Sequence, residues 1–520
     1  MKSFKTLTLR CIFVFICLLA APCVLHAQTF TGPELLARPT DSSITVHVVV
    51  DTSLQLRARY GETSGTWTNY TDPISTTANE PAKVVISGLT PNTQYYYQVG
   101  YSTDGGSTWS YRSRTPERSF RTQRAQGSTF TFTVTSDSHV DIMLGSGTTW
   151  GQTLTRIGSD NPDFHIDCGD TFAMDSVTTA DGARTAYFNQ RSATNNYFPR
   201  ISHSVPIFLA SGNHEQEEGW HLSENLPIWG TNARKRYFPN PIPDGFYTGN
   251  TETDSALEGD QLHEDYYAWN WGDALFIVLD PFWYTTAKPF IGNTGGGEPG
   301  TSDGDRWHWT LGDAQYNWLK STLENSNAKY KFLFMHQPTG GSDDYIRGGA
   351  VAGTYCEWGG QNETGGTWGF STRRPTWPKT IHQILIDTKV SAVFHGHDHQ
   401  FGHEERDGIV YQAIPAAGFS GSGFGIYTGG TYTIQALPSP GHIRITVSPT
   451  EAAVDYVQSS GVSYSYTIDP YTNPTPSLYG DTEPKDCDVD GADIAAYIVA
   501  GGYPGNIDLF ATNFGKTTCQ

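Results

Sequence analysis

Six apolar runs, each followed by a polar motif, organise the chain between residues 130 and 399. Apolar runs of this length, bounded by glycine and polar residues, are typical of buried strands. The runs are Phe130–Thr135, Asp163–Cys168, Val205–Ala210, Ala274–Leu279, Lys331–Met335 and Ser391–His395. Helical patterns at Asp313–Glu324 and Lys379–Thr388 separate some of them. Residues 128–460 are therefore predicted to form one layered αβ domain.

The motifs after these runs carry the residue types that a dinuclear metal site needs. Two divalent ions about 3.5–4 Å apart require a bridging carboxylate together with further oxygen and nitrogen ligands. Because ligands collect at the carboxyl ends of strands in layered αβ folds, we expect these side chains to converge. The candidate ligands are Asp137, His139, Asp170, Asn213, His336, His397 and His399. One such motif alone is a weak signal, but five in this order predict a metal site.

The motifs resemble those of the calcineurin-like metallophosphoesterase superfamily: Asp-x-His, Gly-Asp, Gly-Asn-His-Glu, a lone His and Gly-His-x-His. The resemblance covers residues 130 to about 420 and implies an αββα domain. It implies that one metal is held by Asp137, His139, Asp170 and His399. It implies that the other is held by Asp170, Asn213, His336 and His397, so that Asp170 is the bridge. It also implies a catalytic role for His214, which would contact the substrate and protonate the leaving oxygen.

A β-sandwich followed by this catalytic block also looks like the arrangement in purple acid phosphatases. The segments Tyr266-Tyr267-Ala268-Trp269 and Phe334-Met335-His336-Gln337-Pro338 are similar to theirs. The chain departs from that family in two places. A tyrosine is replaced by Ala173, and a glycine of the first motif is replaced by His139. Without a phenolate ligand there is no reason to expect Fe(III), and the mixed site suits Mn, Fe, Zn or Co.

The predicted reaction is hydrolysis of small phosphomonoesters by metal-activated water, without a covalent enzyme intermediate. The net charge of −20 disfavours DNA or RNA as a partner. A phosphodiesterase or nucleotidase acting through the same site is an alternative. Another is a non-catalytic adhesion or matrix-binding protein built on this scaffold, although an intact ligand set argues against it.

The N-terminus has the pattern of a signal peptide over residues 1–27. Positive residues precede the apolar run Cys11–Leu19, and Leu25-His26-Ala27 offers a cleavage site. A membrane anchor is the alternative, but the run is short for a span. We therefore expect a protein that is secreted, periplasmic or at the cell surface, without stable membrane insertion.

Short strand patterns separated by turns fill residues 30–123 and predict a β-sandwich. The runs are Ile44–Val50, Val84–Ile86 and Tyr95–Val99. The stretch from Leu89 to Val99 resembles the end of a fibronectin type III module. Such a module is either a spacer packed against the enzyme, which we favour, or a ligand-binding unit.

Residues 481–520 are an acidic appendage with the spacing of a calcium loop. The carboxylates that alternate before and after a glycine turn are Asp486, Asp488, Asp490 and Asp493. Oxygen ligands at this spacing suit calcium, although the twelfth position is Tyr497 rather than an acid. The segment resembles a truncated dockerin-like repeat, which would dock to an unknown partner. Cys487 and Cys519 flank it and are predicted to form a disulfide.

Overall fold

The computed structural model of the protein describes residues 29–471, except for residues 116, 143, 290–304, 342–347, 364 and 424–426. The predicted signal peptide, the acidic calcium-loop unit and the Cys487–Cys519 pair lie outside the described residues. In the described part of the chain, no helix combines the length and the apolar character needed to cross a membrane.

The N-terminal region is a β-sandwich of two antiparallel sheets. The strand order is β1-β2-β6 in one sheet and β4-β3-β7-β8 in the other, where β5 pairs with β3 and β9 with β7. The strands are β1 (Gly32–Ala37), β2 (Ser43–Val49), β3 (Gln55–Gly61), β4 (Asn69–Tyr70), β5 (Ile74–Ser75), β6 (Pro81–Ser87), β7 (Gln94–Ser102), β8 (Ser110–Tyr111) and β9 (Ser119–Arg121). Alternate residues of both sheets, such as Val46 and Val99, meet in one apolar core. The predicted N-terminal β-sandwich is confirmed.

Two further sheets follow. One has the order β12-β11-β10-β21-β22-β23, and the other has the order β13-β14-β15-β16-β17-β19-β18-β20. The strands of the first are β10 (Phe130–Thr135), β11 (Phe164–Asp167), β12 (Ile207–Leu209), β21 (His442–Val447), β22 (Ala452–Gln458) and β23 (Gly461–Ile468). Those of the second are β13 (Thr248–Gly249), β14 (Tyr267–Trp271), β15 (Ala274–Val278), β16 (Tyr330–Met335), β17 (Ala392–His395), β18 (Phe401–Arg406), β19 (Ile409–Ala413) and β20 (Thr433–Leu437).

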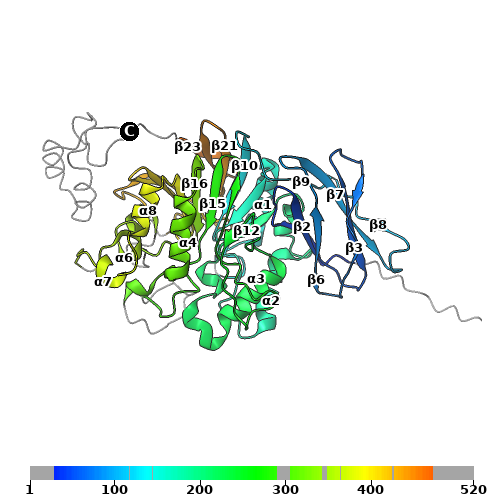
Figure 1. Ribbon diagram of the computed structural model, residues 1–520, viewed down its shortest axis with the longest axis horizontal. Coiled ribbons are helices and arrows are strands. Elements are labelled where there is room, and N and C mark those ends of the chain that lie inside the picture. Colours follow the sequence, from blue (N-terminus) through cyan, green and yellow to red (C-terminus); the bar gives the residue numbers. More distant parts are fainter. Residues whose placement is uncertain are drawn as a thin grey trace, which may run out of the picture.

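Helices cover the outer faces of these two sheets, so that the domain has four layers (Figure 1). On the six-stranded sheet lie α1 (Gly147–Asp160), α2 (Ala180–Arg191) and α3 (Leu226–Tyr237). On the eight-stranded sheet lie α4 (Gly312–Glu324) and α8 (Ile381–Asp387), with the short helices α5 (Gly349–Ala352), α6 (Cys356–Gly359) and α7 (Phe370–Arg373) nearby. The 3-10 turns are η1 (Phe198–Arg200), η2 (Asn213–Glu215), η3 (Gly219–Glu224) and η4 (Arg306–His308). The αββα architecture expected from the sequence is confirmed.

The central strands are apolar on both faces because each face packs against another layer. In β16, Phe332 and Phe334 point into the core between the sheets, whereas Leu333 and Met335 pack against the helices. This explains why the sequence shows continuous apolar runs rather than alternation. β10, β11 and β12 run parallel, as do β15, β16 and β17. The motifs that follow these strands therefore lie at one edge of the domain, where the carboxyl ends of the strands meet.

The sandwich is joined to the catalytic block through buried hydrogen bonds. The guanidinium of Arg191, at the end of α2, donates to the carbonyls of Pro33 (3.1 Å) and His47 (2.6 Å) in the sandwich. It also donates to the carbonyl of Tyr237 at the end of α3 (2.9 Å). Arg191 is only 1% exposed. The two regions therefore share a desolvated polar contact.

Candidate metal centre

Each predicted ligand lies just beyond the end of a central strand. Asp137 and His139 follow β10, and Asp170 follows β11. Asn213 begins the 3-10 turn after β12. On the second sheet, His336 follows β16, and His397 and His399 follow β17. All seven side chains are buried, and the fold brings them together from both sheets.

An unusual backbone conformation aims these side chains at one another. Five of the seven residues have a positive φ: Asp137 (54°), His139 (50°), Asp170 (57°), His397 (73°) and His399 (57°). Residues other than glycine seldom adopt this left-handed conformation, which costs on the order of 1–3 kcal/mol each. Such strain persists only where the surrounding structure imposes it, and it concentrates at functional sites.

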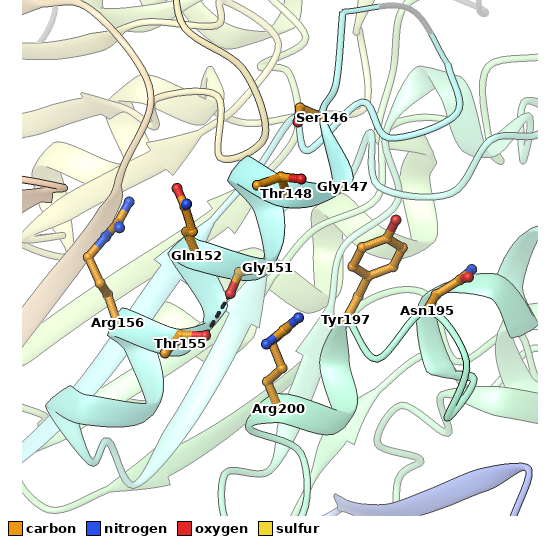
Figure 2. Close-up of a pocket in the computed structure, with 10 residues that line it drawn as sticks. All are labelled: Ser146, Gly147, Thr148, Gly151, Gln152, Thr155, Arg156, Asn195, Tyr197 and Arg200. Atoms are coloured by element: carbon orange, nitrogen blue, oxygen red, sulfur yellow. Dashed lines mark hydrogen bonds between the residues drawn. The ribbon is translucent and has the colours of Figure 1, made fainter.

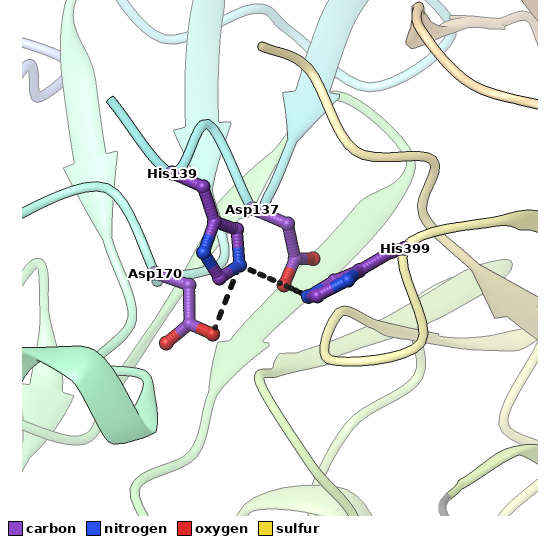
Figure 3. A group of neighbouring side chains, drawn as sticks. All are labelled: Asp137, His139, Asp170 and His399. Carbon is purple, nitrogen blue, oxygen red and sulfur yellow. Dashed lines mark ion pairs between the residues drawn. The ribbon is translucent and has the colours of Figure 1, made fainter. Parts of the chain in front are cut away.

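The first group of side chains consists of Asp137, His139, Asp170 and His399 (Figure 3). Nε2 of His139 lies 3.5 Å from a carboxylate oxygen of Asp137 and 3.5 Å from one of Asp170. Nε2 of His399 lies 3.3 Å from the same oxygen of Asp137. The donor atoms therefore face a common point from loops after β10, β11 and β17.

The second group shares Asp170 with the first. Nε2 of His336 lies 3.1 Å from Oδ2 of Asp170 and 3.1 Å from Oδ1 of Asn213. Nδ1 of His397 lies 2.9 Å from the same amide oxygen. The other nitrogen of His336, Nδ1, lies 2.8 Å from the carbonyl of Cys168. Because a carbonyl can only accept, Nδ1 carries the proton and Nε2 is left as the ligand atom.

These distances fit two metal ions. Two ligands on one ion with bonds of about 2.0–2.2 Å lie about 3 Å apart, close to the separations in both groups. Neither ring nitrogen of the buried His139 has a hydrogen-bond partner among the described residues, so an ion would satisfy it. The mixed imidazole, carboxylate and amide set suits divalent or transition metals and does not select one of them.

Glu215 holds the two central loops together. Its carboxylate accepts backbone N–H groups from Asp170, Thr171 and Phe172, each at 2.9 Å, and from Gly212 at 2.6 Å. Burial and the neighbouring Asp170 charge raise the pKa of Glu215 to about 7. Four donors around one buried carboxylate fix the loop that carries the shared aspartate.

His214 lies beside the centre but belongs to neither group of potential ligands. Its Nδ1 is 2.7 Å from a carboxylate oxygen of Asp175, so Nδ1 donates, and its Nε2 has no hydrogen-bond partner among the described residues. Nε2 lies 3.8 Å from the carboxylate of Asp170. Burial lowers the pKa of His214, but the charges of Asp170 and Asp175 outweigh burial and raise it above the ordinary value.

Asp175 is a candidate functional residue that the sequence motifs did not predict. It follows Asp170 by five positions, and only the turn after β11 brings it to His214. Phe419 was also missed; its ring meets those of His139 and His399 edge-on, with centroids 5.6 and 5.2 Å apart. An acidic residue a few positions after the Gly-Asp motif was the signal that could have identified Asp175. The sequence offered no signal for Phe419.

Three further histidines lie outside the two groups of potential ligands. His165 lies in β11, and its two ring nitrogens are each 2.9 Å from a threonine hydroxyl of β10, Thr133 and Thr135. His203 lies against the sandwich, where its carbonyl accepts the Tyr97 hydroxyl at 2.8 Å. His395 is buried at the end of β17. None of the three is in either group of potential ligands.

The sequence model of the calcineurin-like phosphoesterase family matches residues 130–401. Among solved structures, the fold is similar to that of PhoD, with 15% identity, 85% of this chain and 89% of that chain covered, and a TM-score of 0.59. It is also similar to the purple acid phosphatase PPD1 from yellow lupin (Lupinus luteus) seeds, with 16% identity, 86% and 75% covered, and a TM-score of 0.57. No curated protein sequence matches the chain.

Proposed function

The chain belongs to the calcineurin-like phosphoesterase family and is a metal-dependent phosphoric ester hydrolase, and we propose that its substrates are small phosphomonoesters. The observation that carries the proposal is the single carboxylate, Asp170, that both groups of potential ligands share. A shared carboxylate is what a two-metal hydrolase needs to hold its ions at a fixed separation.

We assign the first ion to Asp137, His139 and His399, and the second to Asn213, His336 and His397, with Asp170 between them. Two ions held there would supply positive charge for the phosphoryl oxygens and would lower the pKa of the attacking water. Two contacts within the chain support this assignment. Glu215 holds the loop of Asp170, and the Cys168 carbonyl keeps Nε2 of His336 unprotonated.

His214 is the proposed general acid. Its Nδ1 is held by Asp175, which orients the ring and favours its protonated form. Its Nε2 lies beside Asp170 and has no hydrogen-bond partner in the described part of the chain, so it is available to donate to the leaving oxygen of the ester. A protonated imidazole at this place also stabilises negative charge that develops during bond cleavage.

A small phosphomonoester fits the charge of the chain better than a polymer does. A net charge of −20 repels polynucleotides, whereas a compact dianion can be held by two metal ions alone. We also propose export of the protein after cleavage behind Ala27, based on the N-terminal sequence pattern. N-terminal sequencing of the exported protein should then begin at Gln28; an uncleaved N-terminus would contradict this part.

The test is a comparison of kcat/KM for an aryl phosphate and for its bis-aryl diester, measured on protein loaded with one metal at a time. We expect about two ions per chain and a higher value for the monoester. The variant Asp170→Asn should lose at least about 100-fold in kcat/KM and part of its metal, because both ions lose a ligand. Asp181→Asn, a change at an exposed side chain in the first turn of α2, is the matched control. A clear preference for the diester would instead assign the chain to phosphodiester hydrolysis.

A further inference from the structure

A hollow with a volume of about 670 Å³ lies along α1, apart from the metal centre. Figure 2 shows Gln152 and Arg156 projecting from α1, and Asn195, Tyr197 and Arg200 rising from the neighbouring segment before and within η1. The residues that line it are Ser146, Gly147, Thr148, Gly151, Gln152, Thr155, Arg156, Asn195, Tyr197 and Arg200. None of them belongs to either group of potential metal ligands. Its volume suits a small organic molecule.

The charge of this hollow is the reverse of that of the chain. Its lining contains two arginines and no acidic residue, in a chain with 53 acidic and 33 basic residues. Within the described part of the chain, neither Arg156 nor Arg200 has a carboxylate partner, and Nε of Arg156 is buried without a hydrogen-bond partner. Arg234 and Arg444, by contrast, pair with carboxylates at 2.9 and 2.8 Å. Two unpaired guanidinium groups in an acidic protein indicate a place for an anion.

Glycines of α1 position the side chains on one flank of the hollow. A Cβ atom at Gly147 would lie 2.2 Å from the Tyr197 hydroxyl, and one at Gly151 would lie 3.1 Å from the Arg200 guanidinium. Both side chains therefore rest directly on the helix, which limits the rotamers of Arg200. A donor fork held in place loses less conformational freedom when an anion binds. Hydroxyl and amide groups of Thr148, Gln152 and Asn195 complete a polar lining.

We propose that this hollow is a second anion-binding site, which takes a small polar molecule through its phosphate group. The two guanidinium groups flank the surface of Gly151 and Thr155 and supply paired N–H donors, while the neutral side chains contact the polar body of the ligand. The site adjoins the metal centre through the backbone. Ser146 follows the loop that carries His139, where Gly145 N–H donates to the His139 carbonyl at 3.2 Å.

The test is equilibrium dialysis of the full, metal-loaded chain against inorganic phosphate. Wild type should bind one more phosphate per chain than the double variant Arg156→Ala/Arg200→Ala. Alternatively, the affinity of that additional phosphate should fall by at least about tenfold, because charge-assisted hydrogen bonds are lost. The control Arg184→Ala/Arg373→Ala removes the same charge from exposed arginines that already have carboxylate partners. It should bind phosphate as wild type does.

Equal phosphate binding by wild type and the hollow variant would overturn the proposal. So would an equal loss in the control, since that would reflect net charge alone. Turnover of an aryl phosphate should be the same in all three proteins, because neither arginine contacts the metal centre. A wild-type chain without any turnover would count against the proposed function, while the difference in bound phosphate would still decide on this site.

Discussion

At the scale of single residues, His214 and Asp175 form a pair whose effect on the reaction can be separated from metal binding. The distance of 2.7 Å between Nδ1 of His214 and the carboxylate of Asp175 fixes the ring, and neither of the two groups of potential ligands includes these residues. In the proposed reaction Asp175 would act through His214 as a positioning residue, whereas His214 would itself touch the substrate.

We predict that His214→Ala lowers kcat by about 10²–10⁴-fold, the range for loss of a general acid, while two ions remain bound. Asp175→Asn should cost less, and almost nothing when it is added to His214→Ala, because its effect passes through that ring. Steady-state kinetics and metal analysis of the two single variants and the double variant test this. Loss of metal in His214→Ala would make it a ligand and refute the assignment.

At the scale of elements, the turn after β17 depends on a glycine for a close approach. A Cβ atom at Gly396 would lie 2.1 Å from the Ser136 hydroxyl and 2.9 Å from the carboxylate of Asp137. A side chain at position 396 would push the loop after β17 away from the loop after β10. The Gly-His-x-His motif thus begins with glycine for a steric reason.

We predict that Gly396→Ala lowers metal affinity and destabilises the fold by about 1–3 kcal/mol, as overpacking does in buried regions. Gly421→Ala is the matched control, because the nearest atom to its added Cβ is 3.9 Å away and its φ is not positive. Metal titration and urea unfolding of both variants provide the measurements. Unchanged metal binding in Gly396→Ala would show that the loops can separate without cost.

The pairing of β10 with β11 should make stability depend on pH. Burial and the charge of His442 lower the pKa of His165 to about 3. In the unfolded chain His165 has a pKa near about 6.5. As the pH falls below this value, the unfolded chain binds a proton at His165 and the folded chain does not. The stability that neutral His165 contributes to the folded state is fully present above about pH 6.5 and is lost as the pH falls toward 3. At pH 4 the loss amounts to roughly 3 kcal/mol, at 1.36 kcal/mol per pH unit.

We predict that His165→Gln flattens the dependence of the unfolding free energy on pH between about 6.5 and 4. The readout is the difference in slope from wild type, measured by urea unfolding at several pH values, so a uniform loss of stability does not affect it. His308→Gln, a change at a 40% exposed side chain, is the control. Parallel slopes for wild type and His165→Gln would contradict the prediction.

At the scale of the whole molecule, the sandwich is part of the folded enzyme rather than a tethered module. Arg191 reaches from α2 to the carbonyls of Pro33 and His47, and Tyr97 donates to the carbonyl of His203. These polar groups are buried between the two regions, so separation would leave them without partners unless water enters. The contact agrees with a role for the sandwich as a packed spacer.

We predict that Arg191→Ala destabilises the protein by about 3 kcal/mol, because two buried carbonyls and one partly buried carbonyl lose their donor. Arg184→Ala, on the exposed side of the same helix, should change stability by less than about 0.5 kcal/mol. Urea unfolding followed by tryptophan fluorescence measures both. An unaffected Arg191→Ala would mean that this contact between the sandwich and the catalytic block adds nothing to the stability of the protein.

The sequence alone determined the elements and the chemistry. Runs such as Phe130–Thr135 predicted buried strands because both faces of a layered sheet exclude water, and the motifs after them predicted two metals because the ligand types are restrictive. Tertiary packing decided the rest. The backbone N–H of His397 donates to the carboxylate of Asp137, 260 residues away, and Arg191 donates to a carbonyl of the sandwich. Both contacts depend on how the layers dock. No local pattern encodes such contacts, because each joins segments that lie far apart along the chain.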